Sequence, residues 1–197
     1  MAQFERRIHR ATLRVMYTLS GAYAYAGQIA GSASTVPAAQ DANHIFAPGE
    51  WGPTPADERH RLVLFGVFDL PGGVQVSPVF QAASARPFNL LAGSDLNKDG
   101  QSNDRYIDPA SGQQVSVNSQ RGDPFSLLDA RVTKFFNLGQ TSRKVSVFAE
   151  FFNLLNTANF GAAYNGNGRS TLFKQPIGFI PGSGYPFQVQ LGARFTF

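Results

Sequence analysis

The chain contains 197 residues, of which 43% are hydrophobic and only 15% are charged, with a formal net charge of +4. Soluble domains usually carry about a quarter charged residues, whereas disordered chains lack aromatic residues on the scale of the 18 Phe and 6 Tyr counted here. Since there is no cysteine, disulfides, cysteine-ligated zinc and thiol catalysis are excluded. The sequence therefore fits one folded domain over residues 1–197 with an unusually uncharged surface.

The basic residues do not indicate a nucleic-acid partner. The 17 Lys and Arg are scattered along the chain, and only FERRIHRATLR concentrates them. No zinc-finger, RRM or basic-helix pattern accompanies that segment. No run of about 18 apolar residues predicts a membrane helix. The residues after FERRIHRATLR alternate between apolar and polar, unlike the continuous apolar core of a signal peptide.

Six segments alternate apolar and other residues with the period of two that predicts β-strands. In the first segment, the apolar face holds Leu13, Val15, Tyr17 and Leu19. The second, HRLVLFGVFDL, has two fairly apolar faces, and the third, VQVSPVFQAA, contains Pro78. Because proline donates no ladder hydrogen bond, Pro78 weakens the prediction of the third strand.

Three segments in the second half of the chain alternate more regularly, namely LLDARVTKFFNL, RKVSVFAEFFNLLN and PFQVQLGARFTF. Lys134 is a charged exception on the apolar face of the fourth segment. FAEFFNLLNTANF offers a short helix as an alternative, but Val145 to Phe148 favour a strand. In the sixth segment, the apolar face comprises Phe187, Val189, Leu191, Ala193, Phe195 and Phe197.

The connections between these segments are alternately long and short. The three long connections are about Ala26 to Asp57, SDLNKDGQSNDRYIDPASGQQ and NTANFGAAYNGNGRSTLFKQPIGFIPGSGYP. The two short connections are LPGG and NLGQTSR. Loops beyond about 15 residues are uncommon in compact domains, and an antiparallel meander places all three at one end. The asymmetry predicts the C-terminal part of a transmembrane β-barrel with long extracellular loops. A soluble β-sandwich, a binding or adhesive module with or without calcium, shows the same alternation and stays open as the alternative.

Five stretches resemble the C-terminal end of TonB-dependent outer-membrane receptors of the Oar-like group. They are EWGPTPADERHRLVLFGVFDLPGG, ARPFNLLAGSDLNKDGQSNDRYID, SLLDARVTKFFNLG, VFAEFFNLLNTANF and QVQLGARFTF. Together they cover most of the chain from about Tyr17 onward. The resemblance implies a protein of the bacterial outer membrane that takes part in the uptake of a ligand, which these strands do not identify.

The same resemblance implies partners and missing parts. Receptors of this group have an N-terminal plug, a carboxypeptidase-regulatory-like domain and a barrel of about 22 strands. The implied partners are outer-membrane lipid, the barrel-assembly machinery and the energy-coupling TonB complex, which acts through an N-terminal region. The sequence predicts only about six strands and no plug, whereas barrels need at least eight strands. We therefore expect an incomplete barrel, in which MAQFERR is the tail of a preceding strand and its periplasmic turn.

One loop has the spacing of a calcium-binding loop. In DLNKDGQSNDRYID, the oxygen-bearing residues Asp95, Asn97 and Asp99 alternate before Gly100. Alternate oxygen ligands can converge on a hard cation around a glycine turn. Position twelve, however, is Tyr106 where a bidentate Glu belongs, and Asn103, Asp104 or Asp108 would have to replace it. A solvated turn rich in Asp and Asn is the alternative, and calcium is the only cofactor that the sequence suggests.

The remaining charged residues predict structure and not catalysis. The cluster from Asp57 to Arg61 lies where the second strand begins, and we interpret it as a charged rim. There is no HExxH, GxSxG or phosphate-binding glycine loop, so we expect no enzyme. Four charged residues lie on polar strand faces, which face the lumen in a barrel, and we expect them to form cross-strand ion pairs or to touch the plug: Asp129, Arg131, Glu150 and Arg194.

The C-terminal QLGARFTF resembles the β-signal of outer-membrane proteins. The resemblance rests on a polar residue, an apolar residue, a glycine and then aromatic residues two apart. It implies that the barrel-assembly machinery recognises Leu191, Gly192, Phe195 and Phe197. An ordinary edge strand that ends in Phe is the alternative.

Overall fold

The computed structural model describes residues 1–26, 39–41, 43–139 and 144–196, and every regular element among them is a β-strand. Among the described residues, no helix has the length and hydrophobicity needed to span a membrane. The short helix considered for FAEFFNLLNTANF is absent, because the residues up to Phe151 pair on both sides with neighbouring strands and Phe152 pairs with β11. The predicted all-β class is confirmed.

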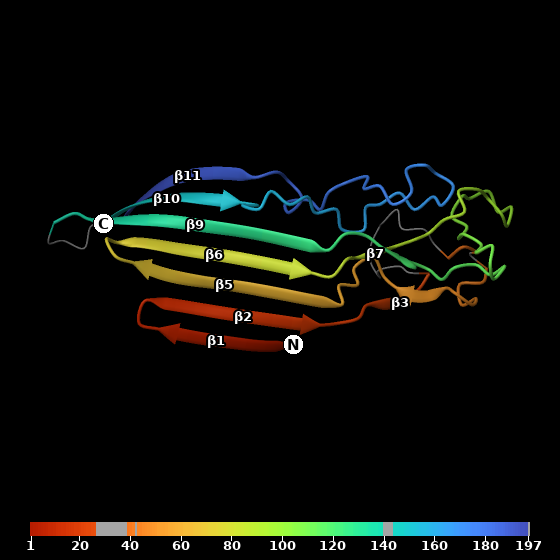
Figure 1. Cartoon of the computed structure of the whole chain (residues 1–197), viewed down its shortest axis with the longest axis horizontal. Helices are drawn as coiled ribbons and strands as arrows, with labels where there is room; N and C mark the ends of the chain where they lie inside the picture. The colour runs from red at the N-terminus through yellow and green to blue at the C-terminus, as the bar shows by residue number, and fades with distance from the viewer. Residues whose placement is uncertain (27–38, 42, 140–143, 197) are drawn as a thin grey trace.

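Seven antiparallel strands form one large sheet, in which the spatial order is the chain order (Figure 1). They are β1 (Ala2–Ile8), β2 (Ala11–Leu19), β5 (His60–Leu70), β6 (Val74–Ala83), β9 (Phe125–Asn137), β10 (Lys144–Phe152) and β11 (Gln188–Thr196). The predicted antiparallel meander is confirmed, and all six predicted strands are present. β1 and β11 are the outer strands, and the described strands do not close into a barrel.

The expected number of about six strands is one too low for this sheet. Residues 2–8, which we interpreted as the tail of a strand and its turn, form a seven-residue strand. The register pairs Ala2 with Tyr17 and Ile8 with Ala11, so that only His9 and Arg10 make the turn. Each residue of β1 is therefore paired with a residue of β2 along one edge of the strand.

The pairing register separates the side chains into two faces, because directly paired residues of antiparallel strands project to the same side. We call one side the apolar face, whose large members are Phe4, Ile8, Leu13, Val15, Tyr17, Leu19, Leu62, Leu64, Phe68, Leu70, Val74, Val76, Phe80, Leu128, Val132, Phe136, Val145, Val147, Phe151, Val189, Leu191 and Phe195. Its polar exceptions are Arg6, His60, Ser126 and Lys134. The other side, the polar face, carries most of the charged and hydroxyl side chains of the strands. The alternation predicted from the sequence is confirmed.

Pro78 lies within β6 in spite of the missing N–H, and the pairing shows how the sheet accommodates it. The described pairs between β5 and β6 pass from Phe65–Val79 to Phe68–Val76. The gap between these pairs contains Pro78, so the hydrogen bond that proline cannot donate falls there. On its other side, Pro78 stays in register with Ala130 of β9.

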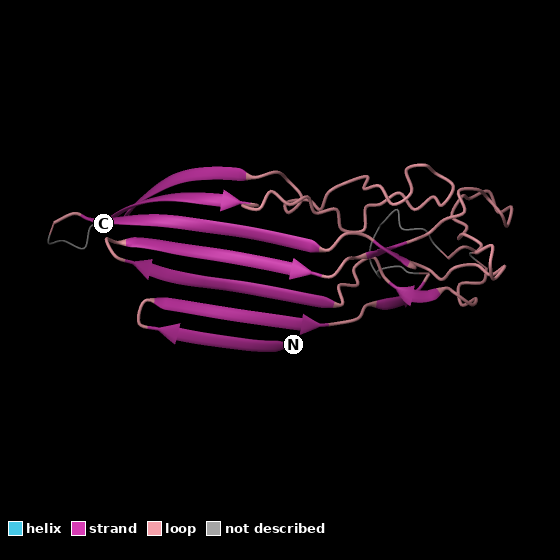
Figure 2. Cartoon of the chain, in the orientation of Figure 1, coloured by secondary structure: helices cyan, strands magenta, loops and turns pink. Residues whose placement is uncertain are grey.

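The short turns and the long loops lie at opposite ends of the sheet (Figures 1 and 2). The turns join β1 to β2, β5 to β6 and β9 to β10, and the loops leave from the other end, which we call the loop end. The loop end carries two small sheets, β3 (Tyr23–Tyr25) with β4 (Trp51–Pro53) and β7 (Pro87–Phe88) with β8 (Gln120–Arg121). The predicted alternation of long and short connections is confirmed.

Gly192 of β11 has a packing role in the sheet. It pairs with Phe148 of β10, and the Phe148 ring lies across the space that a side chain at position 192 would occupy. An added Cβ would lie 2.3 Å from Phe148 Cζ. The absence of a side chain at Gly192 therefore lets Phe148 lie flat on the polar face.

We predict that Gly192→Ala lowers the free energy of unfolding by about 1–3 kcal/mol, because the Phe148 ring has to move. Denaturant unfolding of the detergent-refolded chain, followed by circular dichroism, measures the effect. Gly178→Ala is the matched control, since its Cβ would make only an ordinary 3.5 Å contact with Ala163. Equal stability of the two variants would contradict the packing role.

Candidate functional site

The apolar face is uncovered across the whole sheet. Each large strand contacts chiefly its sheet neighbours, and the described strands of the two small sheets do not pack on the large sheet. Leu191 is 76% exposed, Leu19 59% and Phe195 53%. The buried apolar residues lie elsewhere, as Leu127 does on the polar face and Phe88, Val117 and Tyr164 do in the loops. A contiguous apolar surface of this width marks a site of contact with another apolar phase or partner.

Aromatic side chains lie near both ends of the apolar face. At the loop end, the Tyr17 hydroxyl and His60 Nδ1 are 2.7 Å apart, and Phe151 stacks with Phe187 at a centroid distance of 6.5 Å. At the turn end, Phe136 and Phe195 both lie opposite Val145. Phe187, predicted as part of the last strand, precedes it. Aromatic side chains thus occur at both margins of the apolar face, although Phe4 and Phe80 lie in register between them.

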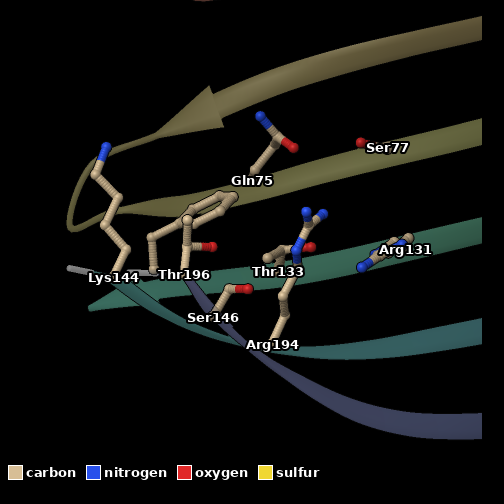
Figure 3. A pocket seen from close by; sticks show the side chains of 9 residues that line it. Gln75, Ser77, Arg131, Thr133, Lys144, Ser146, Arg194 and Thr196 are labelled. Atoms are coloured by element: carbon tan, nitrogen blue, oxygen red, sulfur yellow. The ribbon is translucent and has the colours of Figure 1, made fainter. Parts of the chain in front are cut away.

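A hollow of about 360 Å³ lies on the polar face between β6, β9, β10 and β11 (Figure 3). Its lining combines three basic side chains with hydroxyl and amide groups, and Phe135 is its large apolar member. The lining residues are Gln75, Ser77, Arg131, Thr133, Phe135, Lys144, Ser146, Arg194 and Thr196. A site with these groups can donate many hydrogen bonds and carries positive charge.

All four charged residues predicted for the polar strand faces lie on the polar face. Arg131 and Glu150 are paired in register, and Arg131 Nη1 lies 3.3 Å from Glu150 Oε1, so the predicted cross-strand ion pair is formed. Asp129 instead accepts a hydrogen bond from the Asn153 N–H at 2.8 Å. Arg194 lines the hollow. That this face lines a lumen stays a prediction.

Charged side chains tie the loops to one another. The Asp57 side chain is fully buried and accepts hydrogen bonds from Arg121 Nη2 at 2.7 Å and from the Ala22 N–H at 3.0 Å. Glu58 binds Arg61 at 2.6 Å and Arg86 at 2.7 Å. The charged cluster that we interpreted as a rim thus joins the loop before β5 to the loop between β6 and β9.

A second ion pair in the loops is more deeply buried. Arg105 Nη2 lies 2.7 Å from Glu50 Oε1, and the two side chains are 5% and 2% exposed. Arg105 Nε also donates to the carbonyl of Val115 at 2.9 Å. Because a buried charge without a partner is costly, this pair fixes the two loops against each other. The pairing was not predicted, since its residues are 55 positions apart.

The predicted calcium ligands share one loop, and their oxygens already accept backbone hydrogen bonds. Asp95 accepts from Lys98 at 2.6 Å and from Gly100 at 2.9 Å. Asn97 Oδ1 accepts from the Asp99 N–H, and Asp99 accepts from the Gln101 N–H and from the Asn97 side-chain amide. Asp104 also faces this loop and accepts from the N–H groups of residues 96 and 97. No group of three or more His, Asp or Glu suited to a metal is found in the described part of the chain, and calcium binding stays a prediction.

The predicted assembly signal lies on the outer strand of the sheet. Leu191 and Phe195 project from the apolar face of β11, and Gly192 lies between them on the other face. Phe197 lies outside the described residues. Recognition of this strand by the assembly machinery stays a prediction.

Comparison with protein-family models, with curated proteins and with solved structures finds no match to this chain. The resemblance to TonB-dependent receptors therefore rests on the quoted sequence stretches.

We predict that Asp57→Asn loosens the loop end. Burial on its own raises the pKa of Asp57, but the hydrogen bonds from Arg121 and Ala22 outweigh it and hold the pKa below the ordinary 3.8. A lowered pKa means that the carboxylate stabilises the fold above pH ~3.8 and that this contribution is lost as the pH falls further. At neutral pH, the free energy of local opening measured by hydrogen exchange at β3 and β4 should be about 1–3 kcal/mol lower in the variant than in the wild type.

The matched control is Asp69→Asn, which lies at the opposite end of the sheet. It should leave the exchange of β3 and β4 unchanged. If hydrogen-exchange protection factors of β3 and β4 in the wild-type chain are the same at pH 3 and pH 6, the role of Asp57 is contradicted.

The calcium hypothesis predicts a saturable heat when calcium chloride is titrated into the folded chain. The double variant Asp95→Asn, Asp99→Asn should remove that heat, because it removes the negative charge of two of the three proposed ligands. Arg169→Gln, a change of charge in another loop, should leave it unchanged. A flat calorimetric titration of the wild-type chain would refute calcium binding.

Proposed function

We propose that this chain forms a segment of the barrel wall of a bacterial outer-membrane receptor of the TonB-dependent type. The observation that carries the proposal is the uncovered apolar face, which continues across all seven strands of the sheet. In water, such a face would be a site of aggregation, whereas lipid chains cover it without further protein. Apart from the gap at Pro78, each strand is paired along its length with its sheet neighbours, and a membrane-spanning structure requires such pairing of its backbone groups.

The height of the apolar face supports contact with a membrane. On β5, apolar residues alternate from Leu62 to Leu70, which is about 26 Å along a strand that rises ~3.3 Å per residue. A strand tilt of about 40° reduces this to roughly 20 Å, close to the ~25 Å apolar band of outer-membrane barrels. The aromatic residues at both margins fit the aromatic girdles of such barrels.

The separation of turns and loops supports an orientation. Outer-membrane barrels have short periplasmic turns and long extracellular loops. The ion-paired loops of this chain would then lie outside the cell, and the two-residue turn at His9 and Arg10 would lie in the periplasm. β11 runs toward the turn end, which places the predicted assembly signal on the periplasmic side.

The proposed activity is uptake, and the chain has no catalytic role in it. The loops would contribute to binding of the transported ligand, whose identity stays open. Energy coupling through the TonB complex and insertion by the barrel-assembly machinery would use the partners that the resemblance implies. No observation favours the soluble β-sandwich module, because no second large sheet covers the apolar face in the described residues.

We predict that Leu191→Arg impairs insertion into lipid vesicles, whereas Gln190→Arg does not. The two residues are neighbours on β11, but Leu191 belongs to the apolar face and Gln190 to the polar face. An Arg near the membrane midplane costs about 2–4 kcal/mol on a lipid-facing position and little on the opposite side. Refolding of a receptor that ends with this chain from urea into phosphatidylcholine vesicles, followed by heat-modifiable electrophoresis and protease protection, measures insertion.

Refolding into vesicles needs no assembly machinery, so the test does not depend on the predicted signal that includes Leu191. Equal insertion of both variants would contradict the assignment of the faces. Recovery of the folded wild-type chain in a soluble fraction, without vesicles or detergent, would contradict the membrane proposal itself.

The assembly signal makes a separate prediction in cells. In a receptor that ends with this chain, deletion of Phe197 or the change Phe195→Ala should lower the amount of protein at the cell surface. Thr196→Ala is the matched control, because Thr196 projects from the other side of the strand. Surface proteolysis measures the outcome, and unchanged surface levels of both altered proteins would refute the signal.

A further inference from the structure

The hollow on the polar face has an unbalanced positive charge. Arg131, Lys144 and Arg194 line it, and no carboxylate does. Arg131 is paired with Glu150, whereas neither Lys144 nor Arg194 has a carboxylate within ion-pair distance among the described residues. Positive groups that share a hollow raise the local concentration of anions.

The side chains of the hollow project to one side of the sheet, as Figure 3 shows. Arg194 pairs in register with Ser146, which is small, and Lys144 lies two residues from Ser146 on the same strand. Arg131 lies on the next strand, beyond the Phe148 ring, and its guanidinium is 3.8 Å from the centre of that ring. The small side chains of β10 and β11 thus open a space that longer basic side chains border.

Hydrogen-bond donors complete the lining. Thr133, Ser146 and Thr196 carry hydroxyl groups, and the Gln75 side chain brings an amide. Hydroxyl and amide groups bind phosphate or carboxylate oxygens as readily as they bind water, and an arginine can bind two oxygens of one group. The hollow therefore combines charge, donors and space on a single face.

We propose that this hollow is a binding site for a small anion that carries at least two phosphate groups. Arg194 lies beside Ser146 of β10, and Arg131 lies beside Glu150 of the same strand. Along β10, the backbone of Lys144 is about 7 Å from Ser146 toward the turn end, and the backbone of Glu150 is about 13 Å from Ser146 toward the loop end. The long basic side chains shorten these separations. One phosphate can reach Lys144 and Arg194 together, and a second phosphate can reach Arg131. The volume of about 360 Å³ is within the range of small-molecule sites.

This inference goes beyond the proposed membrane function and does not require it. The site lies on the face that a barrel turns toward its lumen, but the anion binds to the side chains of the folded sheet. Binding to the detergent-refolded chain can therefore succeed where insertion into vesicles fails, and the reverse also holds.

Calorimetric titration of the refolded full chain with sodium pyrophosphate tests the proposal. The expected result is saturable binding that weakens at least tenfold in Arg194→Gln and in Lys144→Gln, and that weakens as sodium chloride is raised. Arg169→Gln, which removes an exposed charge from the loop between β10 and β11, should bind as the wild type does. Circular dichroism and thermal unfolding establish that all variants are folded.

Two further ligands define the chemistry of the site. Orthophosphate should bind at least tenfold more weakly than pyrophosphate, because a single phosphate cannot reach all three basic residues. Equal affinity for the two anions would overturn the assignment to diphosphates. Absence of saturable binding, an equal loss in Arg169→Gln, or binding of an acidic hexaglutamate peptide in place of pyrophosphate would overturn the site.

Discussion

The structure depends on one constraint, the strict alternation of side chains across seven strands that are held in a continuous register. Each ladder fixes which residues share a face, and a slip of one residue would move a whole set to the other side. The register keeps most large aliphatic side chains of the strands on the apolar face and leaves Arg131, Glu150 and Arg194 on the polar face. The uncovered apolar face, the cross-strand ion pair and the basic hollow are consequences of the same pairing.

The loops follow a different rule, since hydrogen bonds and ion pairs join them around a few buried apolar residues such as Phe88 and Val117. Buried carboxylates at Glu50 and Asp57 each meet an arginine from the loop between β6 and β9. Tyr164 stacks on Phe88 and donates a hydrogen bond to Asp123, so the loop between β10 and β11 joins the same assembly. The sheet places the loops at one end, and their side chains then define the shape of that end.

The sequence allowed the strands to be predicted where the alternation was local and strong, as from Val145 to Phe151. The first strand was predicted only as the tail of a preceding strand and its turn, because Arg6 interrupts its apolar face and because its partner, β2, had to be known to place its full length. The order of long and short connections could also be predicted, since it depends only on the strand positions. The hollow and the loop ion pairs were not, because they join distant segments, as Asp57 and Arg121 do across 64 positions. Their formation depends on the register and not on any local pattern.

The alternate faces of β10 provide the most direct test of the central claim. Since the chain has no cysteine, single cysteines can be placed along this strand one at a time in a vesicle-inserted receptor that ends with this chain. A water-soluble maleimide should label positions 146, 148 and 150 on the polar face and should leave positions 147, 149 and 151 on the apolar face unlabelled, where lipid excludes it. Labelling that is uniform along the strand, or that follows no period of two, would contradict the account.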